Sequence, residues 1–125
     1  MNRRLRSALA ALVALALVAA VAGCSSVPPV EETGNTTTVE VRMIDGKYVP
    51  DTLEVPLGDR LVIELINDDG DLHDLELANG VKSGRFGKGQ SETVDVGVIG
   101  GDVAGWCTIP PHREHGMLLE IRVIP

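Results

Sequence analysis

The residues with the clearest potential for chemistry are a cysteine, a histidine and a methionine near the end of the chain. Four residues separate Cys107 from His112, four more separate His112 from Met117, and His73 lies upstream at the start of a strand-like run. Thiolate and thioether donors suit Cu(I), whereas imidazole tolerates both Cu(I) and Cu(II). Two imidazoles, one thiolate and a weak axial thioether are the ligand set of a mononuclear blue copper site, so the sequence predicts one type 1 copper ion.

Strands must bring these residues together, because the sequence from residue 39 onward follows a β pattern. Alternating apolar and polar residues, separated by turn residues such as Asp-Gly and Asn-Gly, predict short strands. We expect strands at residues 38–43, 52–57, 60–66, 73–78, 91–98, 102–108 and 117–124. Regular spacing of this kind predicts an all-β Greek-key β-sandwich or barrel of about seven to eight strands.

In this arrangement a single connection would carry three of the donors. Cys107 would end one strand, Met117 would begin the next, and His112 would lie in the loop between them. Pro110 and Pro111 precede His112, and each proline fixes φ and removes a backbone donor, so we expect a stiff loop. A neighbouring strand end would supply the second histidine.

The chain resembles the cupredoxin family, which includes plastocyanin-like and azurin-like proteins, over about residues 39–125. The resemblance lies in the segments 55–59, 67, 73–74, 101–107 and 110–117. It implies that His73, Cys107 and His112 are the equatorial copper ligands. It also implies that Met117 is the axial ligand.

The same resemblance implies roles for residues beside the ligands. Asp74 stands where the family often has Asn, which implies that it braces the ligand loop from outside the ligand set. The exposed edge of His112 is implied to be the place where electrons enter and leave. Ile109, Pro110 and Pro111 would form a small apolar patch around that edge, which suits brief encounters with redox partners.

The first 38 residues predict an export signal and a linker. A basic start precedes an apolar run at residues 8–22, which is shorter than the ~20 residues of a membrane-spanning helix. The run ends in Val-Ala-Gly-Cys24 and resembles a bacterial lipobox, which implies lipidation of Cys24 after removal of residues 1–23. An ordinary secretory signal is the alternative. Residues 24–38 are rich in Pro, Ser, Thr and acid, and predict a flexible tether for a domain at 39–125.

Charge and cysteine content restrict the partners. The chain has 11 basic and 18 acidic residues, and without the three signal arginines the mature part has 8 basic and 18 acidic residues, a net charge of −10. This balance argues against nucleic acid and against electrostatic binding to anionic lipid, and favours a basic partner or none. If Cys24 carries lipid, Cys107 is the one remaining thiol, which favours a metal ligand over a disulfide.

We therefore expect a lipid-anchored protein outside the cytoplasm, monomeric and without a small-molecule substrate, that carries single electrons between redox partners. Copper binding without electron transfer, as in a chaperone, scavenger or sensor, stays open as the alternative. An enzyme is disfavoured because the chain has only three histidines and the predicted site uses two. Zinc accepts the same nitrogen and sulfur donors, but a methionine ligand argues against it.

Three other features predict ordinary structural roles. His115, the third histidine, is expected to be solvated, although a pH switch or a weaker metal contact is the alternative. The acidic run at residues 68–71 is expected to be a solvated turn, because a calcium site needs more oxygen ligands at defined spacing. Met43 alternates with valines on the first strand and is expected to pack in the core.

Overall fold

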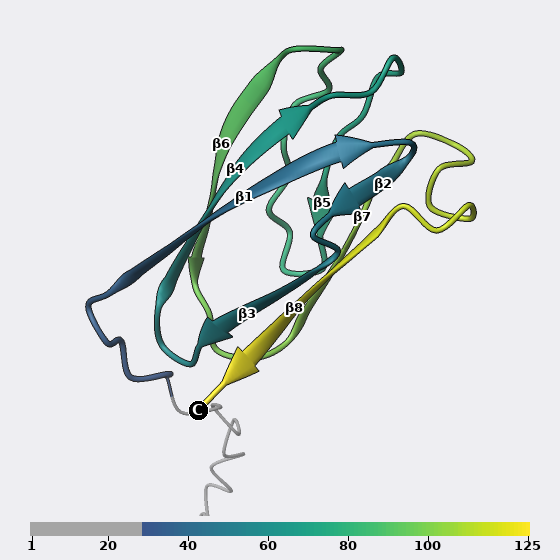
Figure 1. Ribbon diagram of the computed structural model, residues 1–125. Coiled ribbons are helices and arrows are strands. Elements are labelled where there is room, and N and C mark those ends of the chain that lie inside the picture. The colour runs from purple at the N-terminus through teal and green to yellow at the C-terminus, as the bar shows by residue number, and fades with distance from the viewer. Residues whose placement is uncertain (1–28) are drawn as a thin grey trace, which may run out of the picture.

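The computed structural model describes residues 29–125, so the predicted signal and Cys24 lie outside the described residues. Within that range eight strands form two four-stranded sheets, and no helix is present (Figure 1). The prediction of an all-β fold with about seven to eight strands is confirmed. Across the same residues no helix reaches the length and hydropathy that crossing a membrane requires.

Each sheet combines antiparallel and parallel strand pairs. The first sheet has the order β2-β1-β4-β6, with β1 at Thr36–Ile44, β2 at Lys47–Val49, β4 at Arg60–Asn67 and β6 at Ser91–Val98. The second has the order β3-β8-β7-β5, with β3 at Thr52–Pro56, β5 at Glu76–Leu77, β7 at Val103–Trp106 and β8 at Leu118–Ile124. β1 runs parallel to β4, and β3 runs parallel to β8. The chain passes to the other sheet after each strand from β2 to β6, so both sheets form together.

The core lies between the sheets because apolar residues alternate along the strands. In β4 the residues that point inward are Leu61, Ile63 and Leu65, and all three are fully buried. Burial of such a side chain contributes about 1.5–3 kcal/mol. Met43 is also fully buried, as predicted.

Two strands differ from the expected pattern. β2 was not predicted, because it has three residues and depends on the preceding turn, where Asp45 and Gly46 both have positive φ. Two such residues form the tight turn that joins hairpin strands. The strand expected at 73–78 is reduced to β5, and His73 forms only an isolated bridge with Phe86. Because this segment has few backbone hydrogen bonds to neighbouring strands, the side-chain contacts described below fix its position.

The chain is ordered earlier than the predicted boundary. We call residues 30–37 the N-terminal strap. The hydroxyl of Thr33 donates to Oδ1 of Asp59 (2.6 Å) and the hydroxyl of Thr37 donates to Oδ2 (2.8 Å). Asp59 is only 5% exposed. The prediction of a flexible tether over 24–38 is therefore wrong for the strap, because its hydroxyl groups bind a buried carboxylate instead of water.

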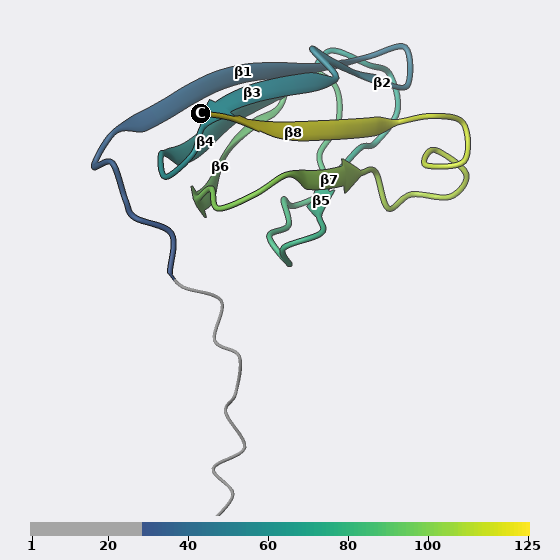
Figure 2. The ribbon, with the colours of Figure 1, turned by 90° about the horizontal axis from the view of Figure 1, so that it is seen from below.

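The two ends of the sandwich have different contents. The loop between β7 and β8, which holds Cys107, His112 and Met117, projects at one end. The C-terminus and the strap lie toward the other end, as Figures 1 and 2 both show. The predicted metal ligands are thus separated from the start of the fold by the length of the strands.

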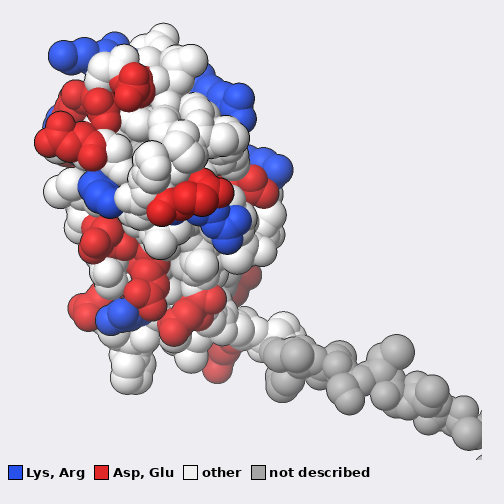
Figure 3. Space-filling view, turned by 90° about the vertical axis from the view of Figure 1, so that its right-hand side faces the viewer, with Lys and Arg blue, Asp and Glu red and all other residues white. Residues whose placement is uncertain are grey.

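The surface carries an excess of acidic groups. Acidic side chains gather along one side of the face in Figure 3, with basic side chains interspersed. Several arginines are already paired with acids: Arg42 contacts Glu40 (2.8 Å) and Asp68 (2.6 Å), and Arg122 contacts Glu120 (2.8 Å). Exposed pairs of this kind add little stability. The charge that is left after this pairing is negative because acidic residues outnumber basic ones.

Candidate metal centre

The β7–β8 loop folds back on itself and brings its two ends together. Cys107 directly follows β7 and Met117 directly precedes β8. The backbone N–H of Cys107 donates to the carbonyl of Met117 (3.2 Å), and the N–H of Met117 donates to the carbonyl of His112 (3.0 Å). These bonds fix the spacing of the three residues. His73 reaches the loop from the other side, at its bridge with Phe86.

Three donor atoms converge on one point. Nδ1 of His73 lies 3.2 Å from Nδ1 of His112, and Sγ of Cys107 lies 3.5 Å from Nδ1 of His112 and 4.0 Å from Nδ1 of His73. Metal bonds of ~2.1 Å to imidazole and ~2.3 Å to thiolate place donors around one ion roughly 3.3–3.8 Å apart. The observed distances lie within or close to this range, so the three donors could reach a single ion. Of the residues that the structure describes, these three form the group able to hold a metal.

Burial differs among the predicted ligands. Cys107 and Met117 are fully buried and His73 is 1% exposed, whereas His112 is half-buried. The two imidazole rings are tilted by 55° with their centroids 4.9 Å apart. Thiolate, two imidazoles and a thioether in a largely buried site fit one type 1 copper ion. The assignment of Met117 as the axial ligand stays a prediction from the family resemblance.

The environment of Cys107 controls its protonation. Burial raises the pKa of this thiol, although the backbone N–H groups of Asp74 and Ile109 act in the opposite direction. Without a metal the sulfur therefore carries its proton at neutral pH. A metal ion that binds here displaces that proton, because the thiolate is the ligand form.

His73 is held by a carboxylate that the sequence analysis did not identify. Nε2 of His73 lies 3.0 Å from Oδ2 of Asp69, and the Asp69 side chain is only 18% exposed. Asp69 also accepts a bond from the N–H of Gly46, which is the main reason that its pKa is lowered. The prediction that residues 68–71 form a solvated turn is therefore wrong for Asp69. An acid four residues before a histidine ligand was the available signal.

Asn67 organises the loop that carries Asp69. It is fully buried at the end of β4. Its side-chain amide donates to the carbonyls of Asp71 (2.9 Å) and Phe86 (2.8 Å), and its Oδ1 accepts from the N–H of Asp69 (2.8 Å). A satisfied polar group of this kind rigidifies the segments that it joins. The sequence signal was a polar residue at the end of an apolar strand.

Asp74 braces the residue that follows Cys107. Its carboxylate accepts bonds from the N–H of Thr108 (2.7 Å), from the Thr108 hydroxyl and from Nε of Arg85 (3.0 Å). Its carbonyl accepts the hydroxyl of Tyr48 (2.5 Å). Burial would raise the pKa of Asp74, but the bonds from Thr108 and Arg85 outweigh it and the pKa is lowered. The bracing role that the resemblance implied for Asp74 stays a prediction, and these contacts are compatible with it.

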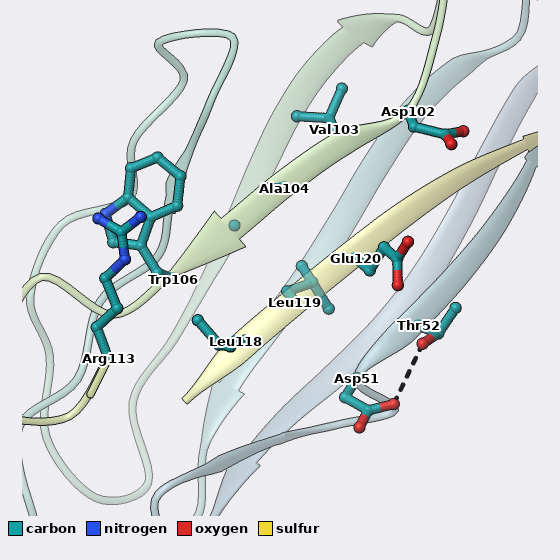
Figure 4. A pocket seen from close by; sticks show the side chains of 11 residues that line it. Asp51, Thr52, Asp102, Val103, Ala104, Trp106, Arg113, Leu118, Leu119 and Glu120 are labelled. Atoms are coloured by element: carbon teal, nitrogen blue, oxygen red, sulfur yellow. Dashed lines mark hydrogen bonds between the residues drawn. The ribbon is translucent and has the colours of Figure 1, made fainter. Parts of the chain in front are cut away.

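The loop is also pinned on its outer side. The guanidinium of Arg113, next to His112, lies 4.2 Å from the centroid of the Trp106 ring. Figure 4 shows this stack at one end of a groove of about 530 Å³ over β7 and β8. A cation over an aromatic ring contributes about 0.5–1 kcal/mol at exposed sites. The stack therefore helps to fix the loop on both sides of the ligands.

The remaining predicted residues lie around the half-buried edge of His112. Ile109 is half-buried, and Pro110 and Pro111 are exposed. A cavity of about 400 Å³ opens beside the imidazoles and is lined by residues that include Asp69, Asp71 and His115. His115 is itself exposed and does not belong to the group of three converging donors.

Comparison with known proteins gives a family and several structural neighbours. The sequence model of the cupredoxin-like domain family matches residues 8–101, and this match ends before Cys107. The comparison with curated proteins found no match.

Among solved structures, auracyanin from Roseiflexus castenholzii aligns with a TM-score of 0.61 and 20% identity, over 74% of this chain and 100% of that chain. Auracyanin A from Chloroflexus aurantiacus, a "blue" copper protein, aligns with a TM-score of 0.55 and 17% identity, over 72% and 100%. The copper-containing nitrite reductase of Thermus scotoductus aligns with a TM-score of 0.56 and 22% identity, over 71% of this chain and 23% of that chain. At these identities the likeness shows a shared fold.

Proposed function

Because the chain belongs to the cupredoxin-like domain family, we propose that it is a blue copper protein that carries single electrons between redox partners. The observation that carries this proposal is the convergence of the donor atoms of His73, Cys107 and His112 within 4.8 Å of one another. These three residues would hold the ion, with Met117 as the predicted fourth ligand. When bound, copper supplies the one-electron couple.

The residues around the ligands suit electron transfer because they hold the donors still. Asp69 contacts the outer nitrogen of His73, and Asp74 holds Thr108 beside Cys107. Arg113 stacks on Trp106 and fixes the loop beyond His112. Ligands that move little between oxidation states lower the reorganisation that each transfer requires. This rigidity favours an electron carrier over a site that must open to bind substrate.

His112 is the proposed electron port. It is half-buried whereas His73 is 1% exposed, so His112 offers the shorter route from the donors to the surface. Ile109, Pro110 and Pro111 surround it with a small apolar contact area that suits weak, brief encounters. The acidic surface would steer a basic redox partner toward the protein and make the association rate depend on salt.

Export and lipid anchoring at Cys24 are part of the same proposal and rest on the sequence pattern at residues 1–24. Replacement of Cys24 by Ser should move the protein from the membrane fraction to the soluble exported fraction. A variant that stays with the membrane to the same extent as the wild type would contradict the lipid anchor.

A visible and EPR spectrum tests the copper site. The full chain with one equivalent of Cu(II) should show an intense blue or green thiolate-to-copper absorption that the Cys107→Ser variant lacks. Rapid, reversible oxidation and reduction with a basic redox protein, slowed by added salt, would support the carrier role. A pale solution with an ordinary Cu(II) EPR signal would contradict it.

Copper handling without electron transfer is the second candidate, and one observation favours it. The cavity of about 400 Å³ beside His73 and His112 is lined by three aspartates, which could attract a cation toward the donors: Asp45, Asp69 and Asp71. Rapid transfer of copper to a competing chelator, together with slow electron exchange, would favour this function. A copper enzyme is disfavoured because only one histidine, His115, remains for a second ion.

A further inference from the structure

The outer nitrogen of His73 meets a negatively charged group inside the protein. Nε2 of His73 lies 3.0 Å from Oδ2 of Asp69, and the histidine is 1% exposed. The same ring directs Nδ1 toward Cys107 and His112. An imidazole that donates Nε2–H to a carboxylate keeps the lone pair on Nδ1. The arrangement therefore presents a free lone pair where the three donors converge.

Asp69 is fixed by contacts that do not involve the metal ligands. Its Oδ2 accepts from the N–H of Gly46 (2.7 Å), its Oδ1 accepts from the N–H of Gly70 (2.7 Å), and its own N–H donates to Asn67 (2.8 Å). Gly46 belongs to the turn between β1 and β2, so two separate segments place the carboxylate. A supporting group that is held this way can orient a ligand before a metal arrives.

We infer that Asp69 is a positioning residue that orients His73 for the metal and stabilises Cu(II) relative to Cu(I). This inference rests on the proposed copper function. A carboxylate that accepts the outer N–H of a histidine ligand raises the basicity of the ring. The more highly charged oxidation state gains more from a basic ligand and from a nearby negative charge, and the effect is strong where water is scarce.

The two histidines are therefore not equivalent. Among residues 29–125, the ring of His112 lies within hydrogen-bond distance of His73 and Cys107, and no carboxylate forms a hydrogen bond with it. His73 is thus the buried ligand whose basicity Asp69 raises, whereas the half-buried His112 is the ligand through which electrons would enter and leave.

The chain offers a matched control for Asp69. Asp71 carries the same charge, lies in the same loop and lines the same cavity, but its carboxylate is exposed and makes no contact with His73. Asp71→Asn removes one negative charge near the site and leaves the bond to His73 intact. Asp69→Asn removes the charge but keeps an oxygen acceptor, whereas Asp69→Ala removes both.

The first test uses the metal-free full chain. Proton–nitrogen NMR of the histidine rings should show the Nε2–H tautomer at His73, with a slowly exchanging proton, in the wild type and in Asp71→Asn. Asp69→Ala should lose that slow proton. An Nδ1–H tautomer at His73 in the wild type would overturn the positioning role, and this result does not depend on whether copper binds.

The second test measures copper affinity and reduction potential for the same proteins. Loss of a supporting contact typically weakens metal binding 10–100-fold. We expect Asp69→Asn and Asp69→Ala to weaken Cu(II) at least tenfold more than Cu(I), which raises the one-electron potential by about 59 mV for each tenfold difference. Asp71→Asn should change this ratio less than threefold, which corresponds to less than about half of the shift for a tenfold change.

Two outcomes of the copper measurement would overturn the tuning role. One is equal shifts in Asp69→Asn and Asp71→Asn, which would mean that only the general charge of the loop matters. The other is a ratio of Cu(II) to Cu(I) affinity in Asp69→Asn that equals the wild-type ratio. If the wild type itself bound no copper, the proposed function would fail together with the tuning role, and the NMR result would still decide whether Asp69 positions His73.

Discussion

Strand β4 connects two polar regions, each organised by a buried polar side chain, that have different roles in the protein. Asp59 lies just before the strand and Asn67 at its end, and both are buried. An eight-residue strand rises ~3.3 Å per residue, so these regions lie about 25 Å apart. In each region a buried polar side chain joins segments that are distant in the sequence. The comparison separates what such a polar group does for stability from what it does for chemistry.

At the Asp59 end the contacts are complete within the protein. Both carboxylate oxygens accept hydroxyl groups, one from Thr33 and one from Thr37. At the Asn67 end the loops instead bring together three donors, from Cys107, His112 and His73, whose atoms face one another. The first region therefore adds to the free energy of unfolding. In the second region the three donor atoms face one another and are available to bind an ion.

The largest expected effect comes from Cys107→Ser, which removes a ligand at the metal end only. Copper at 100 to 1,000 times its dissociation constant should stabilise the wild type by about 3–4 kcal/mol. The variant should lose this stabilisation and the thiolate absorption, while its metal-free stability changes little. Thermal unfolding with and without Cu(II) measures both effects. Equal copper stabilisation in the variant would show that the metal binds elsewhere.

Asp59→Ala should have the next largest effect, and on stability alone. Loss of the carboxylate leaves the hydroxyls of Thr33 and Thr37 without their acceptor, which should cost about 2–4 kcal/mol of unfolding free energy. Urea denaturation measures this loss. The copper spectrum should not change, since the metal end is about 25 Å away. The exposed Glu54→Ala serves as a control and should cost less than ~0.5 kcal/mol. A similar cost in both variants would mean that the strap adds no stability.

A pair of threonine substitutions compares the two ends directly. Thr37 donates to Asp59 and Thr108 donates to Asp74, so Thr37→Val and Thr108→Val each remove one hydroxyl bond to a carboxylate. Each should cost about 1–3 kcal/mol. Only Thr108→Val should alter the copper absorption or potential, because Thr108 follows Cys107. A spectral change in Thr37→Val would show that the two ends are coupled through the sheet.

His115→Gln should have the smallest effect. The ring is exposed and lies outside the converging donors, so the substitution should change stability by less than ~0.5 kcal/mol. The copper spectrum and its dependence on pH should match the wild type. A pH-dependent spectrum that disappears in this variant would assign a switching role to His115 and would extend the metal end to include it.

The sequence predicted the features that depend on residue type and local spacing. Donors of the right chemistry lie at Cys107, His112 and Met117, and alternation in segments such as 60–66 identified β4. Alternation works for such strands because one face of each is buried against the other sheet. The convergence of the donors could be expected once Cys107 and Met117 were placed at neighbouring strand ends.

Other features depend on partners that the sequence does not reveal. The role of Asp69 requires Gly46, which comes from a hairpin turn much earlier in the chain. The strap was mistaken for a linker because its composition is polar. Its order depends on Asp59 and on the parallel pairing of β1 with β4, which begins at Thr36. A polar composition predicts a disordered segment, because it does not show which group in the folded domain accepts a hydrogen bond from each hydroxyl.

The strap also limits how far the folded domain could lie from a membrane. Val30 already packs closely on Gly100, where a Cβ atom would lie 2.6 Å from the valine methyl. If Cys24 carries lipid as proposed, the six residues to Val30 span at most roughly 20 Å, against about 50 Å for a tether that extended to residue 38. The bilayer would then lie close to the Asp59 end, and the His112 edge would face the aqueous side. Soluble partners would have a shorter approach to copper than partners embedded in the same membrane.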